Sequence, residues 1–292
     1  MYTESFLQYL KIEKNYSSHT VESYENDLKQ FKEFAGDGDI LDPASVNSVC
    51  VRRWIVSMMD KGYSPLSVNR KLSTLKSYCK YLRCNKIMDV NPLRLVQGPK
   101  AGKPLPHFVK DSDMKLLLDG DDTDNSFESE RNKAILEVFY STGIRCAELV
   151  GLKNGDVDFG AHTIKVTGKR NRQRLIPFSS ALEEVLFSYI KKKNKETEPE
   201  TDAFFIRKNG RPLSNSIVYG IVHNSLAAVP NLSKRSPHVL RHTFATSMLN
   251  NGADLNAVKE LLGHQSLSST EVYTHTSFEE LKKVYNKAHP RA

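Results

Sequence analysis

The sequence predicts a two-domain protein that is mainly α-helical and carries a small antiparallel β-sheet in its second domain. Apolar side chains recur at three- and four-residue steps, which is the spacing of helices with one buried face. The pattern changes to period two in residues 162–167 and 173–176, which predicts two strands. Residues 91–106 are rich in Pro and Gly, and 292 residues suffice for two domains with substantial cores.

Residues 1–90 are predicted to form a compact domain of four helices. The first is expected near residues 3–13. Apolar residues at helical spacing mark the second from Val21 to Ala35, the third from Val46 to Met58 and the fourth from Val68 to Leu82.

The polar face of the fourth predicted helix carries side chains that can contact phosphates and base edges in a major groove. They are Asn69, Arg70, Ser73, Lys76 and Lys80. The alternative is that this face is only solvated, and the residues by themselves do not decide between the two.

A linker is predicted at residues 91–106, where the run from Gly98 to Pro106 is too rich in Pro and Gly for a helix or a central strand. Residues 107–292 form the second predicted domain. Its two strands flank a β-turn from Gly168 to Arg172, which places Lys169 at a hairpin tip. Its helical patterns cover residues 113–118, 130–140, 180–193, 214–228, 238–250, 256–262 and 278–287. The charged run 191–196 is interpreted as a frayed, solvated helix end.

The chain is moderately basic, since 42 lysines and arginines against 34 aspartates and glutamates give a formal net charge of +8. This excess favours a polyanionic partner. The cysteines Cys50, Cys79, Cys84 and Cys146 show no metal-type spacing, which favours a reduced protein in which they are small buried hydrophobes. The start shows no leader pattern, and no stretch approaches the ~20 apolar residues of a membrane span. We therefore expect a cytoplasmic protein with no membrane partner.

The most informative residues are His238 and Arg241, followed by His264 and Tyr273. Imidazoles and a guanidinium near a phenol suit chemistry on a phosphodiester, because a planar guanidinium binds the non-bridging oxygens bidentately and does not titrate. A second guanidinium is expected from Arg145, just after a glycine that interrupts an apolar helix.

Pattern and order resemble the tyrosine recombinase (phage integrase) family, whose signature is an arginine, a lysine in a β-turn, His-x-x-Arg, a second histidine and a tyrosine nucleophile. All six positions are filled, by Arg145, Lys169, His238, Arg241, His264 and Tyr273. The resemblance covers essentially the whole chain. It is strongest to the Xer group of site-specific recombinases, through the segment from Tyr273 to Ala292.

The resemblance implies an N-terminal core-binding domain that clamps one side of a DNA duplex, and a catalytic domain that ends in an exchange helix. The implied activity is cleavage and rejoining of DNA strands through a 3′-phosphotyrosyl intermediate and a Holliday junction, with no metal, cofactor or ATP. The implied partners are double-stranded DNA and further protomers, in a homo- or hetero-tetramer on two DNA sites. A second recombinase and an activating DNA translocase are further partners that the sequence leaves open.

In this interpretation Tyr273 attacks the scissile phosphorus and a 5′-hydroxyl leaves. A free phenol has a pKa of about 10, so its ionisation near pH 7 costs about 4 kcal/mol unless His264, Arg145 and Arg241 offset it. Lys169 would protonate the departing oxygen, a task that suits an ammonium whose pKa is lowered by burial or by nearby cations.

Other interpretations of the same residues stay open. Arg145 could form a structural salt bridge with Glu148, or Glu148 could orient Arg145 or His238. His238 and His242 lie four residues apart and could bind zinc, but the intervening residues hold no carboxylate and no cysteine cluster adds ligands, so we expect no metal.

The predicted hairpin also allows more than one interpretation. Lys169 lies among further cations, so the alternative to a catalytic lysine is a generic basic patch; these cations are Lys165, Arg170, Arg172 and Arg174. Arg170 and Arg172 are expected to contact DNA.

Leu281, Val284 and Tyr285 share one face of the last predicted helix. The resemblance implies that this helix docks on a neighbouring protomer, and the alternative is that it packs on its own domain.

Several functions compete for this sequence. The favoured one is an Xer-like recombinase that resolves chromosome or plasmid dimers, and so acts in chromosome partition at cell division. The alternatives are a mobile-element integrase or inversion recombinase, a type IB topoisomerase and a non-catalytic DNA-binding module. Because the helical domain begins at once, we expect no additional arm-binding domain.

Overall fold

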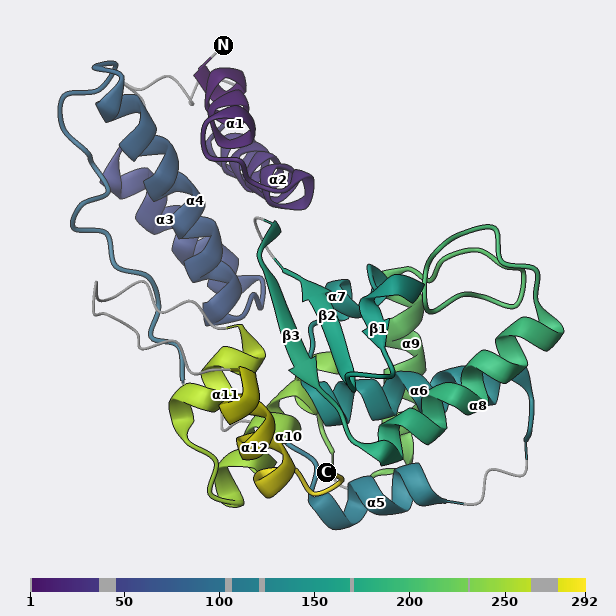
Figure 1. Ribbon diagram of the computed structural model, residues 1–292. Helices are drawn as coiled ribbons and strands as arrows, with labels where there is room; N and C mark the ends of the chain where they lie inside the picture. Colours follow the sequence, from purple (N-terminus) through teal and green to yellow (C-terminus); the bar gives the residue numbers. More distant parts are fainter. Residues whose placement is uncertain are drawn as a thin grey trace. The chain divides into compact units, whose positions relative to one another are not determined.

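The computed structural model describes residues 2–36, 46–102, 107–120, 124–168, 171–230, 232–263 and 278–292. The described chain is mainly helical with a three-stranded antiparallel sheet, which confirms the predicted fold class (Figure 1). The chain divides into two compact units, Met1–Pro104 and Leu105–Ala292, and each has its own hydrophobic core. None of the described helices is long and apolar enough to cross a membrane.

The described part of the first unit consists of helices that closely match the predicted ones. They are α1 (Tyr2–Ile12), α2 (Ser18–Ala35), α3 (Ser48–Asp60) and α4 (Pro65–Cys84). Side chains cap three of them, because Ser17, Asn47 and Ser64 each accept a hydrogen bond from a backbone N–H of the following turn. Aromatic rings fill the core, where Phe31 packs edge-on against Trp54 at 5.0 Å.

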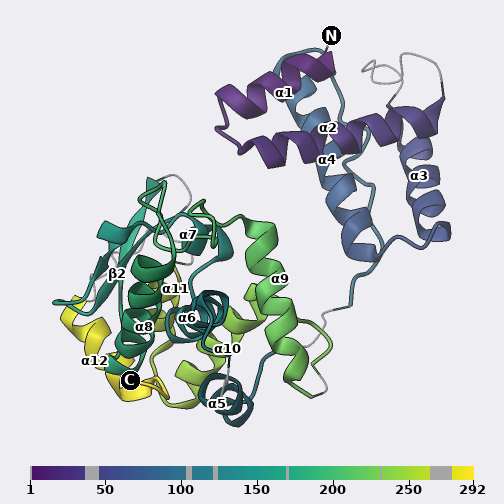
Figure 2. The same ribbon diagram turned by 90° about the vertical axis from the view of Figure 1, so that its right-hand side faces the viewer.

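The second unit is built around helix α6, which its neighbours bury along most of its length (Figure 2). Its described helices are α5 (Asp111–Asp119), α6 (Phe127–Thr142), α7 (Cys146–Val150), α8 (Ser180–Glu196), α9 (Asn215–Ser225), α10 (Pro237–Asn250), α11 (Leu255–Leu262) and α12 (Phe278–Ala288). Short 3-10 turns lie at Asn154–Asp156 and Leu226–Ala228.

The sheet has the strand order β1-β2-β3, with antiparallel neighbours. Strand β2 (Thr163–Thr167) pairs with β3 (Gln173–Pro177) in the predicted hairpin, in a register that sets Lys165 opposite Leu175. Strand β1 (Val157–Asp158) was not predicted, because two residues are too short to show an alternating pattern.

Two predictions about single side chains are wrong. The charged run 191–196 is not simply solvated, since Lys193 is 4% exposed and its Nζ donates to Asn154 Oδ1 and to the carbonyl oxygens of Ala203 and Phe204. Burial lowers the pKa of Lys193 to about 8. Of the cysteines, Cys79 and Cys146 are buried as predicted, whereas Cys50 is half-buried and Cys84, in the last turn of α4, is exposed.

Helix α12 packs on its own unit, against α10, α11 and β3. Its apolar face is buried there through Leu281, Tyr285 and Ala288. This is the packing within one chain, and docking of α12 on a neighbouring protomer stays a prediction.

Candidate active site

Arg145 is positioned by the end of α6. Gly143 caps this helix in the left-handed conformation, at a φ of 59°, and its N–H donates to Phe139 O. A Cβ atom at Gly143 would lie 2.5 Å from the Phe244 ring, so glycine also permits the close approach of α10. The chain then turns, and Arg145 becomes the N-cap residue of α7.

Glu148 on α7 holds both ends of Arg145. One carboxylate oxygen, Oε2, accepts from the Arg145 backbone N–H at 2.8 Å, and the other, Oε1, accepts from Arg145 Nη1 at 2.8 Å. The second partner of this carboxylate is Arg174 on β3, whose Nη1 and Nη2 donate to Oε1 and Oε2 at 3.0 Å each. Burial raises the pKa of Glu148, but hydrogen bonds from Arg174 and Arg145 outweigh it, so the net pKa lies below its usual range.

The predicted salt bridge between Arg145 and Glu148 is therefore present, and the hydrogen bonds of Glu148 go to Arg145 and Arg174 rather than to His238. Two cations of the hairpin are paired, Arg174 with Glu148 and Lys165 with Asp156. These two do not belong to a free basic patch.

Arg241 lies on α10 and is 8% exposed. Its Nη1 donates to Gly143 O and its Nη2 to Leu262 O, both at 2.6 Å. Burial lowers the pKa of Arg241 to about 10, and the nearby charge of Arg145 adds to this effect. The guanidinium is still charged near pH 7.

Three arginines converge on the C-terminal end of α11. Arg174 Nε donates to Leu261 O at 2.7 Å, Arg241 to Leu262 O, and Arg145 Nη2 to Gly263 O at 3.2 Å. The last carbonyls of a helix have no partner within it and carry the negative end of its dipole, so cations are stabilised there. This described stretch of the chain ends at Gly263, immediately before residues 264–277.

His238 lies in the first turn of α10 and is exposed. Its pKa is lowered, first by partial burial and then by the positive charges of Arg241, His242 and Arg145. The neutral imidazole is therefore the form near pH 7, and it can accept or pass on a proton. Arg145, Arg241 and His238 are thus close enough to affect one another electrostatically.

Several predicted site residues, Lys169, Arg170, His264 and Tyr273, lie outside the described residues. Lys169 and His264 each come directly after a described glycine, Gly168 and Gly263. Gly168 precedes Lys169, and its N–H donates to Arg172 O at 2.7 Å across the turn. Arg172, predicted to contact DNA, is exposed.

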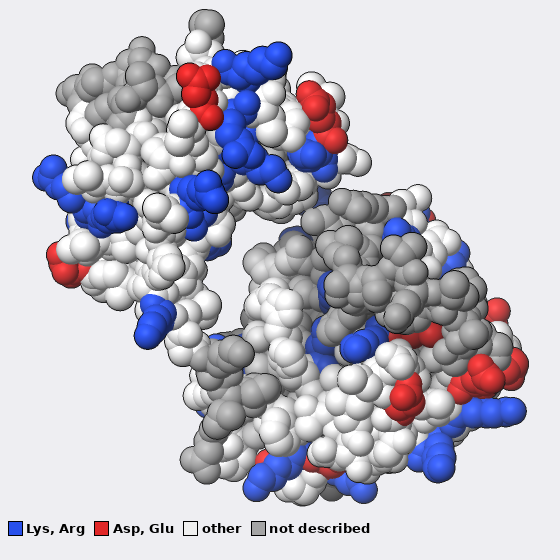
Figure 3. Space-filling model, turned by 90° about the vertical axis from the view of Figure 1, so that its left-hand side faces the viewer, with Lys and Arg blue, Asp and Glu red and all other residues white. Residues whose placement is uncertain are grey.

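The remaining predicted DNA-binding residues lie on α4 in the first unit. Arg70 donates to both oxygens of Asp27 at 2.7 Å, yet half of its side chain is exposed. Asn69 donates to Pro99 O, Ser73 bonds within its own helix, and Lys76 is half-buried. Figure 3 shows Lys and Arg side chains spread over one face of this unit. DNA contact by these side chains stays a prediction.

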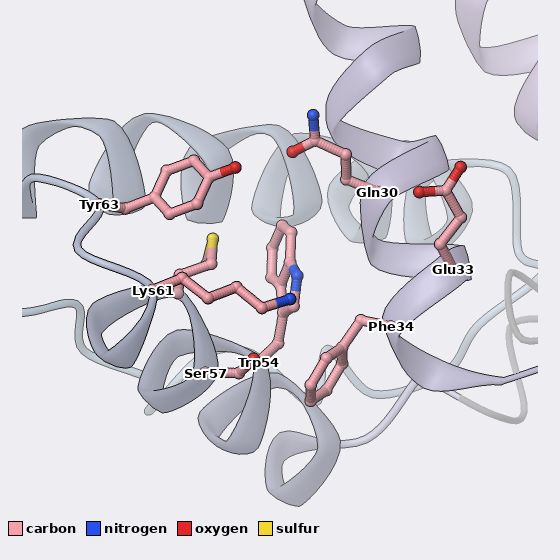
Figure 4. A pocket seen from close by; sticks show the side chains of 8 residues that line it. Gln30, Glu33, Phe34, Trp54, Ser57, Lys61 and Tyr63 are labelled. Carbon is pink, nitrogen blue, oxygen red and sulfur yellow. The ribbon is translucent and has the colours of Figure 1, made fainter.

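A cavity of about 380 Å³ lies in the first unit, between α2, α3 and the turn before α4 (Figure 4). Trp54, Phe34 and Tyr63 line it together with Lys61 and Glu33. The predicted catalytic residues belong to the second unit. Among the residues that the structure describes, no group of three or more His, Cys, Asp or Glu side chains could hold a metal ion.

The charge pattern of the hairpin does not distinguish Arg174 from the exposed cations around it. The alternation of side chains along the strand does indicate that Arg174 is covered. Arg174 is two residues before the buried Ile176, so both side chains point to the same, covered face of β3.

Comparisons with known proteins place the chain in a family. Residues 107–280 match the model of the phage integrase family, and residues 3–86 match that of the phage integrase N-terminal SAM-like domain. A tyrosine recombinase XerC from Halalkalibacterium halodurans is 39% identical over 100% of this chain and 98% of its own length. A tyrosine recombinase XerC from Thermodesulfovibrio yellowstonii is also 39% identical, over 99% and 96%.

Solved structures share the fold. A crystal structure of the XerH site-specific recombinase bound to a palindromic difH substrate matches with a TM-score of 0.74 at 22% identity, covering 96% of this chain and 83% of that one. A Tn1549 transposon integrase in complex with circular intermediate DNA matches with a TM-score of 0.73 at 20% identity, covering 97% and 98%.

Proposed function

The chain belongs to the phage integrase family and is an Xer-like site-specific tyrosine recombinase, and we propose that it resolves chromosome or plasmid dimers. Its proposed catalytic residues are Arg145, Lys169, His238, Arg241, His264 and Tyr273. Enzymes of this family cleave and rejoin DNA strands by transesterification to a tyrosine. The full-length similarity to XerC proteins favours the Xer-like role over that of a mobile-element integrase or inversion recombinase.

One observation carries the assignment of the catalytic residues. Arg145 and Arg241, far apart in the sequence, both donate to the last carbonyls of α11, directly before the segment that contains His264 and Tyr273. Carbonyl oxygens hold both guanidiniums and Glu148 also holds that of Arg145, so the two side chains need little further ordering when a phosphate binds.

In the proposed reaction the Tyr273 oxygen attacks the scissile phosphorus. A bond forms between this oxygen and phosphorus, and the bond from phosphorus to the 5′-oxygen breaks. Arg145 and Arg241 stabilise the charge on the non-bridging oxygens, and loss of one such donor typically costs about 10²- to 10³-fold in rate. Lys169 gives a proton to the leaving 5′-oxygen, while His238 and His264 donate hydrogen bonds or relay the phenol proton. Attack by a 5′-hydroxyl on the phosphotyrosine reverses these steps and rejoins DNA.

The proposed partner is double-stranded DNA, contacted by Asn69, Arg70, Ser73 and Lys76 on α4 and by Arg170 and Arg172 on the hairpin. Four protomers on two duplexes would exchange strands through a Holliday junction, in the cytoplasm and at cell division. A second recombinase and a DNA translocase belong to the same proposal. No cofactor is required, because guanidiniums and a lysine do the charge work that a metal does elsewhere.

The test is a suicide substrate in which a nick near the scissile phosphate lets the cleaved strand diffuse away and traps the adduct. We expect the wild type to form a covalent adduct that peptide mapping places on Tyr273, and Tyr273→Phe to bind the same DNA without forming it. An adduct of undiminished yield with Tyr273→Phe would refute the assignment. Strand exchange between two sites separates a recombinase from a topoisomerase, which would only relax one duplex.

A further inference from the structure

We propose that Arg174 is a positioning residue for the cleavage reaction: it fixes Glu148, and through it Arg145, against the end of α11. This inference rests on the proposed function, in which Arg145 binds the scissile phosphate. It concerns a residue of β3 that lies outside the six catalytic positions.

The first argument is geometric. The Arg174 guanidinium binds both oxygens of Glu148 at 3.0 Å, and its Nε donates to Leu261 O at 2.7 Å. Only a guanidinium has donors in a planar fork that can bind a carboxylate bidentately and reach a second acceptor from its Nε. A lysine would supply the charge, but at a single point.

The second argument is electrostatic. Glu148 is buried, with 4% of its side chain exposed, and it lies between two arginines. Without Arg174, the carboxylate would lose two of its four hydrogen bonds, and only the two from Arg145 would fix its orientation. With Arg174 in place, one edge of the carboxylate is occupied, so Glu148 can hold the backbone and the side chain of Arg145 in one orientation.

The third argument is connectivity. Arg174 follows Lys169 by five positions, and its Nε donates to Leu261 O in the last turn of α11, two residues before Gly263. A Cβ atom at Gly263 would lie 3.0 Å from Arg174 Nη1, so the glycine leaves room for this guanidinium. One side chain therefore ties the strand that follows Lys169 to the carboxylate that orients Arg145 and to the helix that leads to His264.

The experiment compares Arg174→Ala, Arg174→Lys and the wild type on the suicide substrate, with DNA affinity measured separately. We expect Arg174→Ala to lower the cleavage rate about 10²-fold, the typical effect of a misplaced catalytic group, while the Kd for DNA changes less than about twofold. Arg174→Lys should recover only part of this rate. Arg211→Ala, which removes a guanidinium from an exposed pair with Glu200, is the matched control and should cleave at the wild-type rate.

A second substrate separates positioning from a general structural effect. Replacing one non-bridging oxygen of the scissile phosphate by a methyl group removes the negative charge that Arg145 offsets. The replacement gives two stereoisomers, depending on which oxygen is replaced. The isomer that restores the cleavage rate of Arg145→Ala should also restore that of Arg174→Ala. If Arg174→Ala lowers the cleavage rate by the same factor on both substrates, the inference is overturned. An effect that does not act through Arg145 would not depend on the charge of the phosphate. If Arg174→Ala does not fold, the same comparison is made with Arg174→Lys.

The outcomes distinguish the inference from the function on which it rests. If the wild type forms an adduct that Tyr273→Phe lacks, while Arg174→Ala reacts at the wild-type rate, only the inference is refuted. If the wild type forms no adduct on any candidate site, the proposed function fails and the inference falls with it.

Discussion

Protonation of His289 should destabilise the second unit in mild acid. This residue follows α12 and is 5% exposed, with its ring stacked on Tyr285 at 5.0 Å between centroids. Its Nδ1 accepts from the Arg291 N–H at 3.2 Å, so the ring proton sits on Nε2, which donates to Tyr140 O at 3.2 Å. The neutral ring is thus fully paired, whereas a proton on Nδ1 would face another N–H.

Burial lowers the pKa of His289 from 6.5 to about 4, despite the hydrogen bond to Tyr140 O, which acts in the opposite direction. The unfolded chain therefore takes up a proton near pH 6.5 and the folded one near pH 4. The neutral His289 ring therefore contributes fully to the free energy of unfolding above pH 6.5, and this contribution is lost as the pH falls towards 4. A difference of about 2.5 pKa units corresponds to about 3 kcal/mol, of which about 2 kcal/mol is lost between pH 7 and pH 5.

The assay is urea unfolding of the wild type and of His289→Phe at pH 7, 6 and 5. The Phe variant loses the hydrogen bonds, so it should be less stable at pH 7, but the gap should narrow by about 2 kcal/mol at pH 5 because phenylalanine does not titrate. Carboxylates shared by both proteins cancel in this difference. A gap that stays constant over this pH range would refute the reasoning.

Other expected outcomes concern the active site and the tail. Lys169→Ala should lose most cleavage of ordinary DNA and regain it when the bridging 5′-oxygen is replaced by sulfur, a leaving group that needs no proton; no recovery on the sulfur substrate would argue against Lys169 as the acid. Gly143→Ala should lower the free energy of unfolding by more than about 1 kcal/mol, because of the positive φ and the contact with Phe244, and an unchanged urea midpoint would contradict this. Arg291→Ala leaves the fully buried Glu137 without its ion pair at 2.9 Å and should lower the free energy of unfolding by about 3 kcal/mol. Lys153→Ala, which removes an exposed ion pair with Asp202, is the control and should have a much smaller effect. Equal effects of the two variants in urea unfolding would refute this prediction.

Local patterns predicted most of the fold. The helices are found close to their expected positions because burial of one helix face requires apolar residues at fixed spacing, as for α2 and α4. The hairpin of β2 and β3 was likewise visible as period two around a turn. Strand β1 was not, since its pairing depends on a neighbour rather than on its own sequence.

The misjudged side chains share one cause. The charged run around Lys193 predicts a solvated side chain, yet three acceptors outside α8 bind its ammonium. Arg174 lies in sequence among exposed cations, yet Glu148 and Leu261 accept hydrogen bonds from it. In both cases the partners that make burial favourable come from elsewhere in the chain.

The sequence by itself determined which residue types are available for the chemistry, in what order, and which helices and strands carry them. The tertiary structure decided which of those charges meet: it brings Arg145, Arg174 and Arg241 to successive carbonyls of one helix end and places α12 on its own unit. The physical reason is that the spacing that forms an element is local, whereas a charge acts on whatever lies within a few ångströms of it, and only the packed chain fixes those neighbours.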